Sequence, residues 1–284
     1  MRWSTALTLG RVANLPSVWT NTLVGVMLAG GDPTAMEFVL LATALSALYL
    51  GGMFLNDACD ARWDLLHRPE RPIPSGQVSA QEVWRTGLAL LTLGPVLLWL
   101  GRPGDPSAAI AALGLSGVIL AYDLTHKQFR HSAWLMGSCR LMVYLVAALF
   151  VGGITPAVLW AGTAMLCYIA SLTYVAQTEH LNQVHRYWPL LLFAAPVVLV
   201  LTRIDQAPMA IPVALLLCFW LFRQLRTLLP GPHRQVASSV GALLAAIPLV
   251  DATLLAAHGH VMAGALALLA FLTTLQLQRR FAAT

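Results

Sequence analysis

Ten long apolar runs occupy most of this 284-residue chain. A helix needs about 20 mainly apolar residues to cross the hydrocarbon core of a bilayer, and irregular backbone cannot face lipid. The runs cover residues 15–31, 38–55, 83–100, 108–125, 133–153, 156–176, 188–203, 209–228, 236–256 and 261–279. We therefore predict an all-α, polytopic integral membrane bundle that forms a single domain over residues 1–284.

We predict nine or ten transmembrane helices. The seventh run is short and contains Pro189 and Pro196, which disfavour a regular helix. The ninth and tenth runs are separated only by the turn-like stretch 258–260. Ten spans place Arg279 and Arg280 on the same side as the N-terminus, so the ten-span arrangement is preferred.

The chain has few charges for its length. Only 10% of its residues are charged and 58% are hydrophobic, whereas about a quarter of the residues of a soluble domain are charged. A soluble globular protein, a disordered chain and a nucleic-acid-binding domain are excluded, so no nucleic-acid partner is expected. We also expect no signal peptide, because the first ten residues lack an apolar core with a cleavage site.

The basic residues are distributed unequally between the two sides of the predicted bundle. Fourteen of the 17 Lys and Arg residues fall on the side of the N-terminus, only Arg102 and Arg203 fall on the other, and Arg140 lies within a span. Short cytoplasmic loops collect Lys and Arg. We therefore predict that the N-terminus and the long loop 56–82 are cytoplasmic, and we expect a bacterial inner membrane.

Three of the 12 acidic residues lie close together where the second apolar run ends. If the helix continues past Leu55, Asp57, Asp60 and Asp64 share one face with Asn56, over about 10 Å. Like charges this close repel unless a cation neutralises them, and hard oxygen ligands favour Mg²⁺ over zinc. The cluster predicts a site for magnesium and a diphosphate.

Two arginines follow in the same loop. Arg68 precedes Pro69 and Arg71 lies between Pro69 and Pro72, and we expect these prolines to hold the segment extended. The guanidinium fork suits phosphate oxygens. The alternative is a solvated loop in which Asp and Arg side chains merely pair with each other. The concentration of charge in so apolar a chain favours the site.

The motif N-D-x-x-D-x-x-x-D, followed by R-P-x-R-P-I-P-S-G at the end of the second span, resembles the first aspartate-rich motif of the UbiA superfamily of intramembrane prenyltransferases. The resemblance implies Mg²⁺-dependent transfer of a prenyl group from an isoprenyl diphosphate donor to a hydrophobic or aromatic acceptor within the bilayer. It also implies a central cavity open to lipid. By resemblance the metal and diphosphate ligands are Asn56, Asp57, Asp60 and Asp64, the three aspartates being catalytic, with Arg68 and Arg71 on the phosphates.

A second element of the family is a tyrosine followed by basic residues after the fourth span. Tyr122 and Asp123 resemble its start, and Lys127, the only lysine of the chain, would reach the diphosphate as a catalytic residue. The spacing equally allows His126 at the lysine position of the family. Lys127 as a positive-inside anchor is the alternative.

The third element departs from the family. Members usually carry a second D-x-x-x-D type motif after the sixth span, whereas this chain has Glu179 flanked by Gln177 and Asn182. Glu179 is the candidate to hold a second ion, with Gln177 and Asn182 as neutral oxygen ligands and Asp123 as a contributor across the cavity. This departure favours the rival hypothesis of a non-catalytic membrane transporter or lipid-binding protein that retains the fold and the diphosphate site, whereas the intact first motif favours the enzyme.

Two further polar residues lie within spans. The resemblance suggests that Asn21 lines the polar mouth, although interhelical hydrogen bonding explains it equally well. Arg140 is costly inside a bilayer and normally faces a cavity or a partner. It either lines the diphosphate end of the cavity or forms a structural pair with Asp251.

Overall fold

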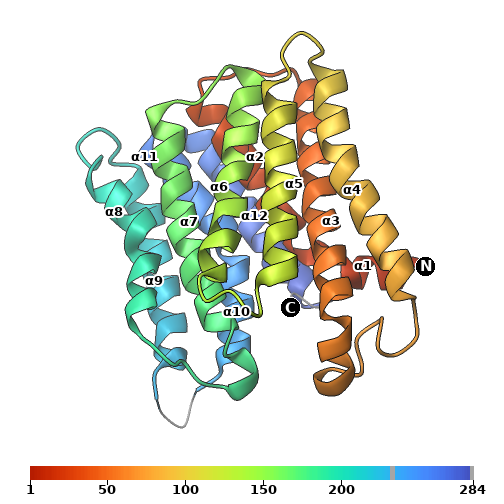
Figure 1. Cartoon of the computed structure of the whole chain (residues 1–284). Helices are drawn as coiled ribbons and strands as arrows, with labels where there is room; N and C mark the ends of the chain where they lie inside the picture. The colour runs from red at the N-terminus through yellow and green to blue at the C-terminus, as the bar shows by residue number, and fades with distance from the viewer. Residues whose placement is uncertain (231–233, 282–284) are drawn as a thin grey trace.

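The computed structural model describes residues 1–230 and 234–281, and the regular structure of these residues is entirely helical (Figure 1). The first helices are α1 (Trp3–Leu9), η1 (Val12–Asn14), α2 (Leu15–Leu28), α3 (Ala35–His67), α4 (Ala80–Gly101), α5 (Ser107–Thr125), α6 (Ser132–Val151) and α7 (Pro156–Ala176). They are followed by η2 (Glu179–Leu181), η3 (Trp188–Ala194), α8 (Ala195–Leu201), α9 (Ala210–Leu228), α10 (Val236–Ala245), α11 (Ile247–Ala257) and α12 (Val261–Gln278). The predicted all-α bundle is confirmed.

Eight segments of the described chain are long and apolar enough to cross a membrane, with α10 and α11 counted together as one. Each matches one predicted run. The other two runs form shorter helices: α2 has 14 residues, and η3 with α8 covers Trp188–Leu201. In α2 the helix ends before Gly30, which adopts a positive φ of 74°. Nine or ten spans therefore remains a prediction.

The helices stand side by side, and α3 extends beyond its neighbours at one end (Figure 1). The loops 68–79 and 126–131 lie at that same end, which is called the site end below. On the outside of the bundle, large apolar side chains such as Met36, Leu191 and Met262 are exposed. An apolar outer surface of this kind is suited to lipid, so the chain is an integral membrane protein.

The starts of α3, α4 and α7 are capped by short polar side chains. Thr34 accepts a hydrogen bond from the backbone N–H of Glu37, and the Glu37 carboxylate accepts the backbone N–H of Thr34 in return. Ser79 and Thr155 cap α4 and α7 in the same way from one side. These bonds satisfy N–H groups that have no partner within the helix.

Small residues allow helices to approach closely at two crossings. A Cβ atom on Gly25 would lie 2.6 Å from the carbonyl oxygen of Tyr144, where α2 crosses α6. A Cβ atom on Gly51 would lie 2.9 Å from the carbonyl oxygen of Gly87, where α3 crosses α4. Such contacts are typical of helix packing in membranes, where small side chains let backbones touch.

The ninth predicted span is broken between α10 and α11. Pro248 has no N–H to donate to a carbonyl of the preceding turn, and the α-helix is interrupted at Ala246. Flanking helices supply donors at the break: the Tyr168 hydroxyl donates to the carbonyl of Leu243 at 2.8 Å, and the Trp220 indole donates to the carbonyl of Ala242 at 3.0 Å. The two donors thus come from flanking helices and bind carbonyls of the last turn before the break.

Candidate active site

The acidic cluster lies on the last turns of α3. This helix has 33 residues, about 13 more than a bilayer crossing requires, and it continues without interruption to His67. The prediction that the helix runs past Leu55 is therefore confirmed. Asp57 and Asp64 are buried, and Asp60 is partly buried. A carboxylate removed from water needs a counter-charge, and each of the three aspartates has one.

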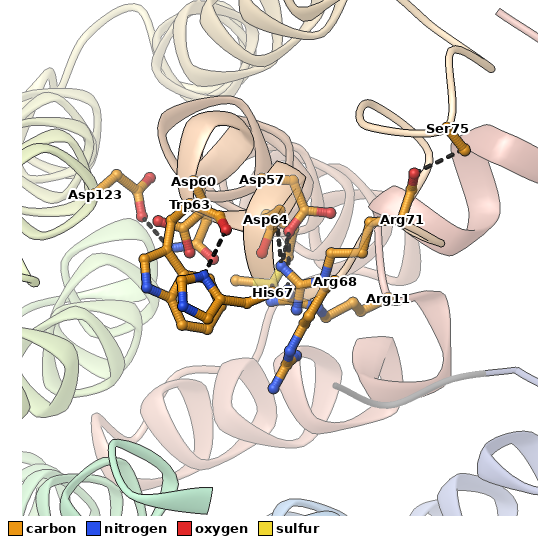
Figure 2. A network of polar contacts seen from close by, with 12 residues as sticks. Arg11, Asp57, Asp60, Trp63, Asp64, His67, Arg68, Arg71, Ser75 and Asp123 are labelled. Atoms are coloured by element: carbon orange, nitrogen blue, oxygen red, sulfur yellow. Dashed lines mark hydrogen bonds and ion pairs between the residues drawn. The ribbon is translucent and has the colours of Figure 1, made fainter. Parts of the chain in front are cut away.

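Two arginines bind the aspartates at the ends of the cluster. Arg71 NH1 lies 2.9 Å from Oδ2 of Asp64, which is 1% exposed, and 3.5 Å from Oδ1 of Asp57. Arg11 NH2 lies 2.9 Å from the same Oδ1 of Asp57. Figure 2 shows Arg11, Arg68 and Arg71 together on one side of the aspartates. The guanidinium groups neutralise the repulsion between these carboxylates.

The middle aspartate is bound by the loop that follows α5. Lys127 Nζ lies 2.5 Å from Oδ1 of Asp60, and His126 Nε2 lies 3.4 Å from the same atom. Lys127 also lies over the Trp63 ring, 4.9 Å from its centroid. Burial alone would lower the pKa of His126, but the contact with Asp60 and the negative charge of that carboxylate outweigh burial, so the pKa of His126 is raised. Both candidates for the lysine position therefore converge on one carboxylate.

The amide of Asn56 connects the cluster to α5. Its Nδ2 donates to Oδ1 of the buried Asp123 at 3.1 Å. This bond orients the amide, because a carboxylate only accepts hydrogen bonds, and it leaves the carbonyl oxygen of Asn56 available to a ligand. Asp123 Oδ2 has no hydrogen-bond partner among the described residues.

The segment after α3 is compact, and the prediction that its prolines hold it extended is wrong. Residues 68–79 form a series of turns in which the backbone N–H of Ser75 donates to the carbonyl of Arg71, and that of Gln77 to the carbonyl of Pro72. Proline fixes φ near −65°, a value that turns accept as readily as extended chain. The turns fold Arg71 back onto the aspartates of α3 (Figure 2).

A cavity of about 720 Å³ opens beside this cluster. Nine of the predicted site residues line it, namely Asn56, Asp60, Asp64, Arg68, Arg71, Tyr122, Lys127, Arg140 and Glu179. Four of the lining residues are called the mouth of the cavity below: Asp60, Asp64, Arg71 and Lys127. Six apolar lining residues are called the apolar wall: Met136, Ile169, Leu172, Val240, Leu244 and Ile247.

Three predicted site residues do not line the cavity. Asp57 and Asp123 are buried just behind it, where they hold Arg11, Arg71 and Asn56. Asn21 is fully buried and accepts a hydrogen bond from Arg140 NH1 at 2.9 Å, so it supports a lining residue instead of lining the mouth itself.

The region of the altered second motif contributes one carboxylate. Glu179 Oε1 lies 4.0 Å from Arg68 NH2 across the cavity. Gln177 donates to the Ser132 hydroxyl at 3.0 Å, and Asn182 accepts the backbone N–H of Val236 at 2.9 Å. Gln177 therefore joins the end of α7 to α6, and Asn182 joins the segment after η2 to α10.

Sequence reasoning missed Arg11, which it treated only as a cytoplasmic charge. Arg11 precedes η1 in a left-handed conformation with φ of 42°, and its carbonyl accepts the hydroxyl of Tyr49 at 3.3 Å. A non-glycine residue at positive φ is uncommon and requires support from its surroundings. Its contact with Asp57, 46 positions along the chain, leaves no local signal in the sequence.

The donor set fits magnesium, although no ready-made cluster is present. No three His, Cys, Asp or Glu side chains in residues 1–230 and 234–281 are grouped as a metal site requires, because basic residues lie between the carboxylates. Magnesium usually takes only one or two protein carboxylates plus substrate phosphates. Asp64 Oδ1 is buried and has no hydrogen-bond partner within the described part of the chain, and a buried oxygen in this state is suited to a cation.

The chain is similar in sequence to a known protein family and to several curated proteins. The sequence model of the UbiA prenyltransferase family matches residues 18–247. Digeranylgeranylglyceryl phosphate synthase of Ignicoccus hospitalis is 33% identical over 157 residues, which are 55% of this chain and 48% of that protein. The protein of the same name from Thermococcus kodakarensis is 31% identical over 145 residues, 51% of this chain and 50% of that one. The chain thus spans about half the length of these curated relatives.

Solved structures with the same fold cover nearly the whole chain. A UbiA homologue from Archaeoglobus fulgidus bound to GPP and Mg²⁺ superposes with a TM-score of 0.62 at 15% identity, over 91% of this chain and 100% of that one. A structure of digeranylgeranylglyceryl phosphate synthase superposes with a TM-score of 0.60 at 20% identity, over 91% and 98% of the two chains. At these identities the similarity concerns the fold.

Proposed function

This chain belongs to the UbiA prenyltransferase family, and on that premise we propose that it transfers the prenyl group of an isoprenyl diphosphate to an acceptor within the membrane, releasing diphosphate. One observation carries the proposal: carboxylates paired with basic side chains line the mouth of a cavity that is also lined by apolar side chains. Such a cavity matches an amphiphile with a diphosphate head and a hydrocarbon tail.

The carboxylates would hold magnesium together with the diphosphate. Asp60 and Asp64 face the cavity and are the principal ligands, with the carbonyl oxygen of Asn56 as a neutral one. Asp57 keeps Arg11 and Arg71 beside them. When bound, Mg²⁺ neutralises charge on the diphosphate and makes it a better leaving group.

The basic residues would stabilise the departing diphosphate. Arg71 and Lys127 each contact a carboxylate that magnesium would take, so they can exchange carboxylate oxygens for phosphate oxygens when the donor binds. Arg68 has a weaker contact, 4.0 Å from Glu179, and is the most readily released. Fixed cations at the point where negative charge develops stabilise a transition state strongly.

The apolar wall would bind the prenyl tail and exclude water. Its side chains come from α6, α7, α10 and α11 and offer no hydrogen-bonding group to water. An allylic cation formed in a wet cavity would be captured as a prenyl alcohol, so exclusion of water protects the transfer. We propose that the cavity opens sideways to lipid, which would admit both long-chain substrates.

The acceptor and the membrane orientation complete the proposal. The curated relatives are named digeranylgeranylglyceryl phosphate synthases, which makes a prenylated glyceryl phosphate the first acceptor to test. The distribution of Lys and Arg favours a cytoplasmic site end, in a bacterial inner membrane.

The test is diphosphate release by the purified protein in nanodiscs, with Mg²⁺, geranyl or geranylgeranyl diphosphate and geranylgeranylglyceryl phosphate. We expect Mg²⁺-dependent release that falls about 100-fold or more in Asp60→Asn and Asp64→Asn. Asp105→Asn is the matched control, because Asp105 is exposed in the loop between α4 and α5. Donor binding without release under any acceptor would support the non-catalytic alternative, and release that survives in Asp60→Asn would refute the assigned site.

A further inference from the structure

Arg140 brings a positive charge into the interior of the bundle. Its NH1 donates to Oδ1 of Asn21 at 2.9 Å, and its Cζ lies 5.5 Å from the centroid of the Tyr49 ring. In the part of the chain that the structure describes, no carboxylate lies at ion-pair distance from Arg140. The guanidinium has five N–H donors and lines the cavity, so it offers donors to a ligand there.

This guanidinium lies much deeper than the mouth. Tyr49 precedes Asp60 by eleven residues on α3, which is about 16 Å of helix. On α6, Arg140 is eight residues from the first residue, Ser132, or about 12 Å above the site end of that helix. A diphosphate held at the mouth would therefore not contact Arg140, and the Arg140 guanidinium would remain available to a different anion.

A buried carboxylate lies behind Arg140. Asp251 on α11 is 0% exposed, and its three hydrogen-bond partners among the described residues all donate to it. The Tyr144 hydroxyl donates to Oδ1, the Thr20 hydroxyl donates to Oδ2 at 2.5 Å, and Asn21 Nδ2 donates to Oδ2 at 2.7 Å. The carboxylate is fully satisfied without touching Arg140, which rules out the direct structural pair that was one of the two alternatives for these residues.

The amide of Asn21 transmits the orientation of Asp251 to Arg140. An ionised carboxylate only accepts hydrogen bonds and a guanidinium only donates them. The nitrogen of the amide must therefore face Asp251 and its oxygen must face Arg140, as observed. A neutral side chain in place of Asp251 would remove this constraint and allow the amide to turn over.

We propose that Arg140 forms a second anion site, which binds the phosphate or carboxylate group of the acceptor, and that Asp251 and Asn21 are positioning residues for it. The assignment of the anion to the acceptor rests on the proposed function. A neutral acceptor would leave a desolvated guanidinium without a counter-charge, which is costly in an interior of low dielectric. The site therefore selects anionic acceptors, with their charged group deeper in the cavity than the mouth.

The test measures binding of simple amphiphiles to the purified protein in nanodiscs. The mouth is first saturated with Mg²⁺ and inorganic diphosphate, and dodecyl phosphate, dodecanoate or dodecanol is then titrated while the unfolding temperature is recorded. We expect at least one of the two anions to raise the unfolding temperature, the choice between them identifying the preferred group, and dodecanol to have no effect. In Arg140→Gln the affinity for that anion should fall about 10-fold to 100-fold.

The matched control is Arg102→Gln, which removes the same charge at the opposite end of the bundle, where Arg102 contacts Phe150. It should bind the anion as the unaltered protein does. Undiminished binding by Arg140→Gln, or no response of the unaltered protein to either anion, would overturn the proposal. If Mg²⁺ and diphosphate alone do not raise the unfolding temperature of the unaltered protein, the result counts against the proposed function. The two failures are therefore distinguishable.

The positioning role has its own readout. Asp251→Asn should weaken anion binding several-fold while leaving the response to Mg²⁺ and diphosphate unchanged. The exchanged pair, Asn21→Asp with Asp251→Asn, places a carboxylate directly against Arg140, so the guanidinium gains a counter-charge and anion binding should be lost while the response to Mg²⁺ and diphosphate is kept. A merely structural role predicts that both responses fall together, and full binding by Asp251→Asn would refute the positioning of Arg140 by Asp251.

Discussion

Lys127 and Asp60 meet at the mouth of the cavity, with 2.5 Å between Nζ and Oδ1. The two residues come from different helices, since Asp60 lies on α3 and Lys127 follows the end of α5. His126 approaches the same oxygen at 3.4 Å. Two basic side chains, Lys127 and His126, thus contact the same carboxylate oxygen of Asp60. They differ in charge and in their distance from that oxygen.

Replacement of Lys127 should be more harmful than replacement of His126. Lys127→Met removes a permanent charge from the mouth, and we expect kcat for diphosphate release to fall about 100-fold. His126→Gln retains a hydrogen-bond donor near Asp60, so its loss should be about 10-fold or less. Steady-state release of diphosphate measures both variants, and the reverse order would assign the lysine role of the family to His126.

The fork of Arg71 should matter beyond its charge. Arg71→Lys keeps a cation but cannot bridge Asp57 and Asp64 as the guanidinium does, at 3.5 and 2.9 Å. We expect KM for the donor to rise about tenfold. Arg62→Lys is the control, because Arg62 is on the same helix but outside the cavity lining. Equal KM values in both variants would contradict a bidentate role.

Glu179 offers a test of the altered second motif. Its contact with Arg68 is long and partly exposed, so Glu179→Gln should change stability by less than about 1 kcal/mol. If Glu179 helps to hold a second ion, the Mg²⁺ concentration needed for half-maximal release should rise several-fold. The control Glu70→Gln removes an exposed carboxylate from the loop that carries Arg68. An unchanged Mg²⁺ dependence would exclude Glu179 from metal binding.

Packing at the crossing of α2 and α6 makes a prediction about stability. Gly25→Ala places a methyl group 2.6 Å from the carbonyl oxygen of Tyr144, and overpacking of this kind costs about 1–3 kcal/mol. Thermal unfolding in nanodiscs should show the loss. Gly241→Ala on α10 meets nothing within 4 Å and should leave the protein as stable as before, or slightly more so. Similar unfolding temperatures for the two variants would show that the crossing is looser than described.

The orientation of the chain can be tested by labelling in intact cells. In a variant without the native cysteines, Ser75→Cys introduces an exposed thiol at the site end, and Gly104→Cys introduces one in the exposed loop between α4 and α5. A membrane-impermeant maleimide should react with the second thiol alone, because the positive-inside rule places the site end in the cytoplasm. If only the Ser75→Cys thiol is labelled, the site end faces the outside of the cell, which is the opposite of the predicted topology.

The sequence predicted the parts of the site that lie close together along the chain. Asp57, Asp60 and Asp64 could be assigned to one helix face because the helical repeat is local and the apolar run leads directly into them. The loop arginines were expected near these carboxylates, but the conformation of their loop was not. Prolines restrict φ without determining whether successive residues turn or extend.

Contacts between distant helices could not be predicted in this way. Arg11 reaches Asp57 from the start of the chain, and Arg140, Asn21 and Asp251 come from α6, α2 and α11. In the sequence, each of these residues is an isolated polar group within its own segment. Only the tertiary arrangement shows that Asn21 separates Arg140 from Asp251, where the sequence suggested direct pairing or exposure to the cavity.

The break between α10 and α11 divides one span into two segments that differ in how freely their residues can be substituted. Val240 and Leu244, before the break, and Ile247, directly after it, line the apolar wall, whereas Asp251 lies one turn further along α11 among polar partners. The hydroxyl of Tyr168 and the indole of Trp220 hold the backbone of α10 near the break from outside the span. Substitutions at 240 or 244 could thus lengthen or shorten the accommodated hydrocarbon chain during evolution while the environment of Asp251 is preserved.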